Sequence, residues 1–189
     1  MGYHQAGFEV VGVDCAPQPH YPFTFHQADA LTYPLDGFDA VHASPPCYLY
    51  SPVAQQVADR FADYLVETRT RLETSGIPFI IENVPQAPLR HDVVLCGQQF
   101  NLPLYRHRAF EASFELLRPK PCHHVPARSH VRGWRTLDQG VITVAGHAFR
   151  LNEGRLAMEM PWATSRKELV AAIPPAYTEY LGDQLREVV

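Results

Sequence analysis

The sequence contains no apolar stretch near the roughly 20 residues that a membrane-spanning helix needs. Its N-terminus lacks the charged and then apolar pattern of a secretory signal. The four cysteines are scattered without paired spacing, which argues against the disulfide framework of a secreted protein. Low-complexity runs and internal repeats are absent as well. We therefore expect an ordered cytoplasmic protein with free thiols and no membrane contact.

The 189 residues, 46% of them hydrophobic, suffice for one well-buried domain with at most a small additional lobe. Seventeen prolines indicate a chain rich in loops and rigid turns. The net charge of −4 is unevenly distributed, because residues 106–135 carry +5 and the remainder carries −9. A basic segment on an acidic body suits a surface that contacts phosphates, although a solvated charged face produces the same pattern.

Short apolar runs predict the strands of a parallel sheet. Residues 8–14, 38–43 and 78–82 are rich in β-branched and aromatic side chains. Between the last two runs, apolar side chains recur at helical spacing over residues 57–72, and Gly76 is expected to end that helix. The alternation of strands and a helix predicts an α/β fold, in which ligands bind beyond the carboxyl ends of the strands.

The second half of the chain is less regular. Further strands are predicted at 93–96 and 109–114. Residues 117–146 are rich in Pro, His, Arg and Gly, so we expect a small irregular insert there. Helices are expected at 166–172 and, after a Pro-Pro pair that suits a first turn, from 176 towards 189.

Three polar side chains, Asp14, Cys47 and Glu82, follow the ends of predicted strands, so we expect them to converge at one edge of the sheet. Cys47 comes directly after Pro45-Pro46, and a rigid turn that exposes a thiol suits a nucleophile. Taken alone, however, a cysteine is more often a small buried hydrophobic side chain.

Three short motifs follow one another along the chain: Ser44-Pro45-Pro46-Cys47, Glu82-Asn83-Val84 and Arg106-His107-Arg108. Together they resemble the DNA cytosine-C5 methyltransferase family. The first is similar to its Pro-Cys nucleophile motif, the second is identical to its Glu-Asn-Val motif, and the third is similar to its Arg-x-Arg motif. Asp14 and Asp29 match the acids after the second and third strands of the family.

The resemblance covers most of residues 2–115 and roughly 155–185, and it is closest to the compact methyltransferases of phages and actinobacteria. It implies a Rossmann-like S-adenosylmethionine-dependent methyltransferase sheet with helices on both faces. The catalytic domain would comprise residues 1–115 and 147–189, and residues 116–146 would form a small target-recognition lobe.

By the same resemblance, the chain transfers a methyl group from S-adenosyl-L-methionine to carbon-5 of a cytosine flipped out of double-stranded DNA. Cys47 would add to carbon-6 and form a covalent adduct. Glu82, with Asn83 in the same catalytic set, would hold a proton shared with ring nitrogen-3 and the exocyclic amine. Arg108 would contact the carbonyl oxygen of the base, and Arg106 would orient the carboxylate or contact a nearby phosphate.

The resemblance also assigns contacts with the cofactor. Asp14 matches the residue that accepts hydrogen bonds from the ribose hydroxyls, and Asp29 matches the one that binds the adenine amine. The other positions implied for the cofactor are Cys15, Ala30 and Pro46.

Contacts with DNA are expected from Tyr48 and from the basic segment. Tyr48 follows the nucleophile, where the family commonly has glutamine. The expected phosphate or base contacts in the basic segment are Arg128, Arg132 and Arg135.

The sequence Cys122-His123-His124 with His130 raises the alternative of a zinc site. Its spacing does not match a site of paired ligands, and a fourth ligand would have to come from far along the chain. We therefore expect no metal site, and we expect these histidines to contact phosphates or bases instead.

In the family, a strand and a Gly-rich cofactor loop precede residues like Gly2-Tyr3-His4, with which this sequence begins. A start codon chosen too far downstream, a partner chain that supplies the strand, and an inactive remnant would each explain the difference. Two alternatives to DNA methylation follow. One is a catalytically silent DNA-binding relative, and the other is a cytosine-modifying enzyme that acts on tRNA or uses another one-carbon donor.

Overall fold

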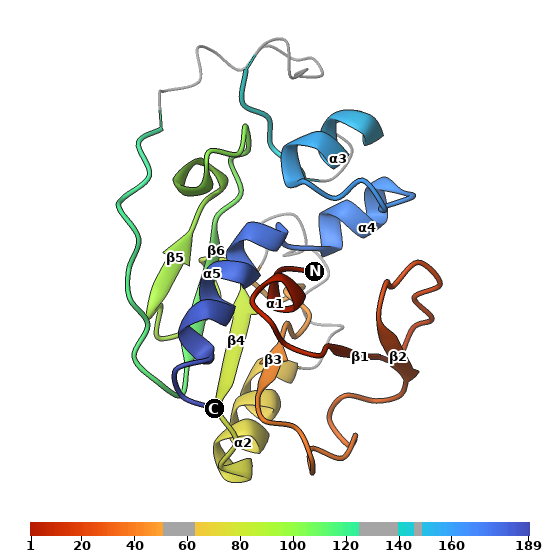
Figure 1. The fold of residues 1–189 in the computed structure, drawn as a ribbon, viewed down its shortest axis with the longest axis vertical. Coiled ribbons are helices and arrows are strands. Elements are labelled where there is room, and N and C mark those ends of the chain that lie inside the picture. The colour runs from red at the N-terminus through yellow and green to blue at the C-terminus, as the bar shows by residue number, and fades with distance from the viewer. Residues whose placement is uncertain (51–62, 125–139, 146–148) are drawn as a thin grey trace. The chain divides into compact units, whose positions relative to one another are not determined.

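The computed structural model describes residues 1–50, 63–124, 140–145 and 149–189, and it has a mixed α/β fold (Figure 1). The chain divides into two compact units, each assembled from three segments. The first unit comprises Met1–Val10, Leu95–Arg106 and Pro119–Asp183. The second unit comprises Val11–Val94, His107–Arg118 and Gln184–Val189. These boundaries differ from those expected at residues 115 and 147.

A four-stranded sheet forms the centre of the second unit, in the order β3 (Val41–Ala43), β4 (Phe79–Asn83), β6 (Arg108–Ala112) and β5 (Val93–Leu95). β3 and β4 are parallel, as predicted, but β4 and β6 are antiparallel, so the sheet is mixed. The apolar pattern identifies these strands but carries no information on their direction. All five residues of β4 are buried, which fits its Phe-Ile-Ile sequence.

Helix α2 (Tyr64–Ser75) packs against one face of this sheet. The Asp63 side chain caps its first turn by accepting a hydrogen bond from the Leu65 N–H at 3.1 Å. Gly76 ends the helix with a left-handed φ of 70°, which confirms the prediction for this residue. The predicted start of the helix lies outside the described residues. The core between helix and sheet consists of Leu65, Leu72, Phe79, Ile81, Ala87, Leu89 and Ala109.

Strands β1 (Val11–Asp14) and β2 (Thr24–Gln27) form a separate two-stranded parallel sheet in the same unit. The apolar pattern predicts β1 but not β2, whose Thr-Phe-His-Gln sequence is short and mostly polar; only the resemblance, which places Asp29 after a strand, implies β2. The residues of β1 are half-buried, and three of the four residues of β2 are exposed. This sheet therefore buries much less side-chain surface than the four-stranded sheet does.

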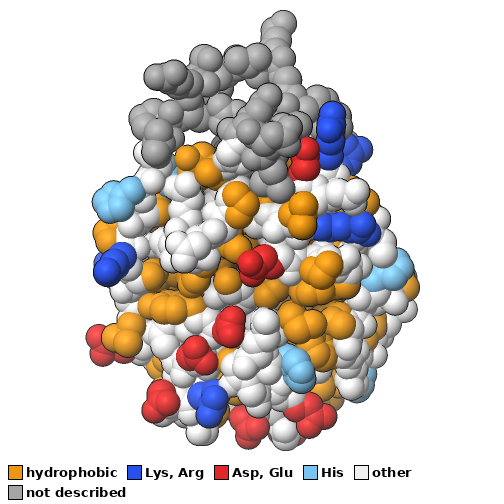
Figure 2. Space-filling model, turned by 45° about the horizontal axis from the view of Figure 1, so that its top comes forward, with side chains coloured by type: hydrophobic (Ala, Val, Ile, Leu, Met, Phe, Trp, Pro, Cys, Tyr) orange, Lys and Arg blue, Asp and Glu red, His pale blue; other side chains and the backbone are white. Residues whose placement is uncertain are grey.

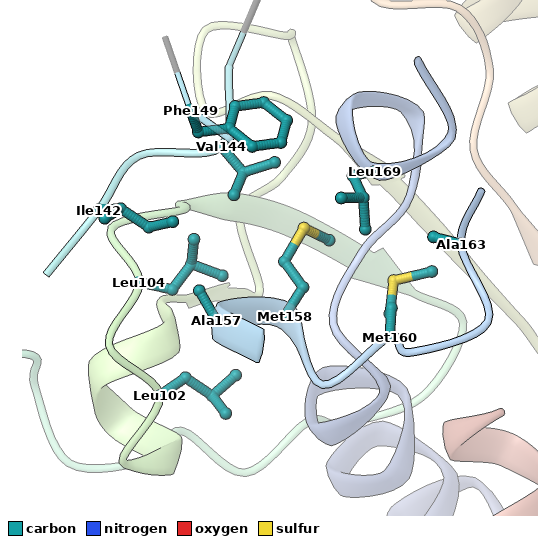
Figure 3. Close-up of a cluster of buried hydrophobic side chains, with 10 residues drawn as sticks. All are labelled: Leu102, Leu104, Ile142, Val144, Phe149, Ala157, Met158, Met160, Ala163 and Leu169. Carbon is teal, nitrogen blue, oxygen red and sulfur yellow. The ribbon is translucent and has the colours of Figure 1, made fainter. Parts of the chain in front are cut away.

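The first unit is built from short helices: α1 (Gly2–Gln5), the 3₁₀ helix η2 (Gly97–Phe100), α3 (Leu151–Met158), α4 (Arg166–Ala171) and most of α5 (Pro175–Leu185). The sequence predicts α4 and α5 but not α3. Figure 3 shows the core of this unit, which consists of Leu102, Leu104, Ile142, Val144, Phe149, Ala157, Met158, Met160, Ala163 and Leu169. Of the helices in the described ranges, none combines the length and the apolar character that crossing a membrane demands.

Candidate active site

Two motifs meet at the carboxyl ends of β3 and β4. The strands are parallel and in register, with Ala43 opposite Ile81, so the residues that follow them lie at the same edge of the sheet. Glu82 and Asn83 are the last two residues of β4, and both are buried. Cys47 lies just beyond β3 and is half-buried. The topology therefore brings the thiol, the carboxylate and the carboxamide to one edge.

A side chain from β4 holds the turn that carries the thiol. The Asn83 amide donates a hydrogen bond from Nδ2 to the Pro45 carbonyl oxygen at 2.9 Å. Neither Pro45 nor Pro46 has a backbone N–H, so the turn cannot be stabilised by donors of its own at these positions. On the other side of the thiol, the Tyr50 N–H donates to the Cys47 carbonyl oxygen at 3.0 Å. Hydrogen bonds thus fix the backbone on both sides of the thiol.

The Glu82 carboxylate forms an ion pair with Arg108, with 2.8 Å between Oε1 and Nε. In the antiparallel pair Glu82 lies opposite Phe110, and Arg108 is two residues earlier on the same face of β6. The side chains are 9% and 17% exposed, so this charge-assisted hydrogen bond is largely shielded from water. Arg108 also donates from Nη1 to the His107 carbonyl oxygen at 2.8 Å. The pair fixes the orientation of the carboxylate.

Arg106, the other arginine of the motif, is held within the first unit. Its guanidinium donates hydrogen bonds of 2.6 Å to three backbone carbonyls, those of Val144, Val170 and Ala172. Its own carbonyl accepts a hydrogen bond of 2.5 Å from the Tyr177 hydroxyl, and the residue is 5% exposed. These contacts give Arg106 a structural role. The contact with the Glu82 carboxylate that the motif predicts for Arg106 is made by Arg108.

His42 on β3 is a residue that sequence reasoning did not single out. Its Nε2 lies 3.0 Å from the Ser44 hydroxyl, and its ring contacts Phe110 with 6.5 Å between centroids. Burial lowers the pKa of His42 to about 4, so the imidazole is neutral at physiological pH. The available signal was a histidine within a predicted strand, directly before the Ser-Pro-Pro-Cys motif.

On the two-stranded sheet, both predicted cofactor acids follow strand ends. The Asp14 carboxylate accepts hydrogen bonds from the Ala16 N–H at 2.8 Å and from the Gln18 amide at 3.3 Å. The Asp29 carboxylate accepts one from the Leu31 N–H at 2.9 Å. An ionised carboxylate offers about four acceptor sites, so each can accept further donors. Each carboxylate therefore has acceptor sites for a ligand that donates hydrogen bonds.

The other predicted cofactor positions, Cys15, Ala30 and Pro46, are exposed. The Cys15 carbonyl accepts a hydrogen bond from the Gln27 amide at 3.1 Å, which ties the residue after β1 to the last residue of β2. The Ala30 carbonyl accepts one from the Arg71 guanidinium on α2. These contacts anchor the two loops through their backbones and leave their side chains accessible.

The predicted DNA contacts are only partly within the described residues. Tyr48 is 49% exposed beside the thiol. Arg128, Arg132 and Arg135 lie outside the described residues. Within them, the Arg118 side chain donates to the Asp92 carbonyl oxygen at 3.0 Å. On the face drawn in Figure 2, acidic, basic and hydrophobic side chains are interspersed, and those that the structure describes form no continuous basic patch there.

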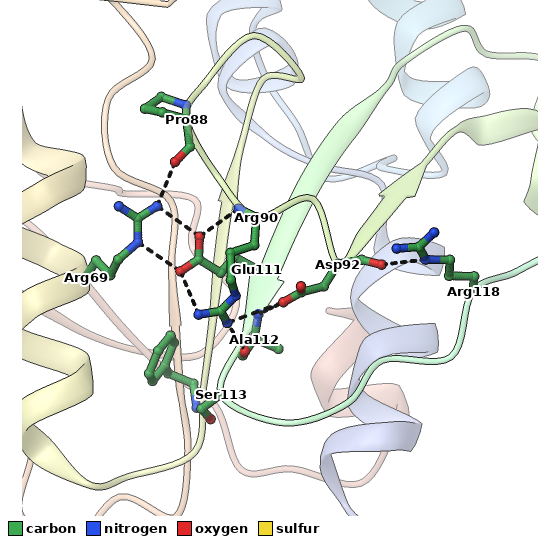
Figure 4. A network of polar contacts seen from close by, with 9 residues as sticks. Arg69, Pro88, Arg90, Asp92, Glu111, Ala112, Ser113 and Arg118 are labelled. Atoms are coloured by element: carbon green, nitrogen blue, oxygen red, sulfur yellow. Dashed lines mark hydrogen bonds and ion pairs between the residues drawn. The ribbon is translucent and has the colours of Figure 1, made fainter.

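A second buried acid, Glu111, lies on the opposite face of the sheet (Figure 4). Its wholly buried carboxylate accepts hydrogen bonds from Arg69 Nε and Nη2 at 2.8 and 2.9 Å, and from the Arg90 N–H at 3.0 Å. Burial alone would raise the pKa of Glu111, but the hydrogen bonds and charges of Arg69 and Arg90 hold the pKa below its usual value. This network links α2 to β6 on the side of the sheet away from Glu82.

These contacts place a thiol, a buried carboxylate held by an arginine and a carboxamide at one sheet edge. A thiol held by a fixed turn at the edge of a sheet is suited to covalent catalysis. No protein-family model matches the sequence, and no curated protein matches it. The expectation of a methyltransferase therefore depends on the motifs and on where the fold places them.

Proposed function

We propose that this chain is a DNA cytosine-C5 methyltransferase in which Cys47 attacks a cytosine that has been flipped out of the duplex. The observation that carries the proposal is the hydrogen bond from Asn83 to the Pro45 carbonyl. It ties the Pro-Pro-Cys turn to the Glu-Asn-Val strand end, so two motifs separated along the chain act on one site. The neighbouring ion pair of Glu82 and Arg108 supplies the carboxylate and the arginine of the proposed site.

In the proposed reaction the Cys47 thiolate forms a bond to carbon-6 of the ring, and the electron pair of the 5,6 double bond becomes available at carbon-5. S-Adenosylmethionine would supply an electrophilic methyl group, which carbon-5 would take up with this electron pair while the bond from the methyl group to the sulfonium sulfur breaks and S-adenosylhomocysteine leaves. The proton on carbon-5 is then lost to a base, and the bond between sulfur and carbon-6 breaks to restore the double bond. Glu82 holds a proton at ring nitrogen-3 and so stabilises the charge that develops on the ring. Arg108 keeps this carboxylate in place and can bind the carbonyl oxygen of the base.

The proposal includes a Rossmann-like arrangement in which the nucleoside part of the cofactor contacts Asp14 and Asp29. Their remaining acceptor sites support this assignment. Among the described strands, β1 pairs only with β2 and β3 only with β4, and the residues of β1 and β3 are half-buried. These one-sided strands support the proposal that a further strand, from upstream sequence or a partner chain, pairs with one of them.

Methyl transfer from labelled S-adenosylmethionine to unmethylated mixed-sequence DNA tests the proposal directly. We expect label in 5-methylcytosine, its loss in Cys47→Ser, and its retention in Thr24→Ala, which changes an exposed strand residue. DNA that contains 5-fluorocytosine should trap a covalent complex that survives denaturing electrophoresis, because fluorine cannot leave carbon-5 as a proton does. The Cys47→Ser protein should form no such complex.

Parallel assays separate the alternatives. Label that enters only tRNA would replace the DNA substrate with RNA. DNA binding without turnover in a folded chain, unchanged by Cys47→Ser, would overturn the proposal in favour of a silent DNA-binding relative.

A further inference from the structure

A group of thiol and imidazole side chains lies within the first unit and takes no part in the proposed reaction. The ligand atoms of Cys96, Cys122 and His124 all lie within 4.8 Å of one another. Cys96 Sγ is 3.2 Å from His124 Nε2, although the two residues are 28 positions apart in the chain. The sequence-based expectation of no metal site considered ligands near Cys122 and missed Cys96.

The distances suit a common metal ion. In tetrahedral zinc sites the bonds to sulfur and nitrogen are about 2.3 and 2.0 Å, so neighbouring ligand atoms are about 3.3–3.8 Å apart. The three side chains need to move little to reach such positions. Two thiolates and an imidazole are soft and borderline ligands, which favour zinc over magnesium or calcium.

The surroundings hold the two ligand-bearing segments together. The Gln99 amide accepts a hydrogen bond from the Cys96 N–H at 2.7 Å and donates one to the Lys120 carbonyl at 2.9 Å. The Tyr105 ring packs against the His124 imidazole, with 4.5 Å between centroids. Contacts of this kind orient the ligands of metal sites from outside the coordination sphere.

Backbone hydrogen bonds also reach the Cys96 sulfur. The N–H groups of Gln98 and Arg106 hydrogen-bond to it, as N–H groups do with metal-bound thiolates.

We propose that Cys96, Cys122 and His124 bind one Zn²⁺ ion within the first unit. The ion would join two segments that lie far apart in the chain, and so would stabilise the fold of this unit. Cys122 and His124 immediately precede the segment that contains Arg128, Arg132 and Arg135, so the ion would anchor the chain where the predicted DNA-contacting segment begins. The inference does not depend on methyl transfer.

The test is metal analysis of the purified full chain under reducing conditions, with Zn²⁺ and then Co²⁺ as the probes. We expect one equivalent of zinc, and we expect the Co²⁺ form to show the intense visible bands and sulfur charge-transfer band of tetrahedral thiolate coordination. Zinc should be lost in Cys122→Ser and His124→Gln and retained in the matched control His123→Gln. In His124→Cys the ion should remain, with a stronger charge-transfer band.

Variants that weaken zinc binding to different degrees distinguish a metal site from a cluster of packed side chains. Gln99→Ala should weaken zinc binding by about 10–100-fold, as loss of a partner outside the coordination sphere does, and Cys122→Ser should weaken it further. A chelator should lower the melting temperature of the wild type but not that of Cys122→Ser. The proposal is overturned if the folded wild type binds no stoichiometric zinc, if Cys122→Ser and His124→Gln retain it, or if Cys96 and Cys122 are joined by a disulfide in reducing buffer.

Discussion

The two sheets of the second unit hold their acidic side chains in different ways. On the four-stranded sheet, Glu82 and Glu111 are buried and are bound by arginines that come from other elements. On the two-stranded sheet, Asp14 and Asp29 each accept a backbone N–H from the residue two positions later. The position of a buried acid therefore depends on the folding of the whole sheet, whereas that of a half-buried or exposed acid depends on its own turn.

The largest effect expected from this difference is on stability. Glu111→Ala would leave Arg69 and Arg90 without their common carboxylate, and we expect the free energy of unfolding to fall by about 3–5 kcal/mol. The matched change Asp29→Ala removes one local hydrogen bond and should cost about 1 kcal/mol. Denaturant unfolding measures both, and equal losses would show that burial does not distinguish the two sheets.

The next effect concerns catalysis. Glu82→Gln keeps the size of the side chain but removes the charge and the proton, so we expect kcat to fall by about 100–1000-fold with little change in DNA affinity. Turnover and equilibrium binding, measured on the same preparation, separate the two quantities. Equal losses of rate and affinity would assign Glu82 to DNA binding instead.

A third, smaller effect is a pH dependence that only the four-stranded sheet should show. The pKa of His42 is about 4 in the folded chain and about 6.5 when unfolded, so the unfolded chain takes up the proton first as pH falls. Stability should therefore decline between pH 6.5 and 4, by about 3 kcal/mol from this residue. His42→Gln should flatten that part of the profile, and an unchanged slope would show that His42 is not its source.

The smallest effect is expected on the two-stranded sheet. A Cβ at Gly12 would lie 2.6 Å from the Tyr21 ring, but this ring is 36% exposed and can turn away. Gly12→Ala should cost less than about 1 kcal/mol. In the first unit, Gly154→Ala meets the Phe149 ring at the same distance, and that ring is wholly buried, so about 1–3 kcal/mol is expected. Thermal unfolding of both variants makes the comparison, and equal shifts would contradict it.

Local patterns predicted the elements that depend on local chemistry. Gly76 ends α2, and the apolar runs before Cys47 and around Glu82 form β3 and β4. The apolar pattern missed strand β2 and helix α3 because their sequences are short and lack a strong apolar period. Contacts with the rest of the fold determine whether such a segment forms a strand or a helix.

The residues of the candidate site also divide into those that the motifs predict and those that only the fold brings together. The motifs predicted Cys47, Glu82 and the two arginines as site residues, and they assigned the contact with the carboxylate, or with a nearby phosphate, to Arg106 rather than to Arg108. The observed pairing depends on the antiparallel register of β4 and β6, which places Arg108 diagonally from Glu82. The approach of Cys96 to Cys122 and His124 is likewise a product of the fold, because no regular spacing relates the three in sequence.

The hydrogen bond from Asn83 to Pro45 has a consequence for how such a sequence can change over generations. The turn before Cys47 takes this hydrogen bond from a residue 38 positions away, so a change in the conformation of one segment affects the other. Recombination that exchanges the two segments separately between diverged genes should yield inactive progeny more often than exchange of both together. We therefore expect selection to act on the two segments together, although they are encoded apart.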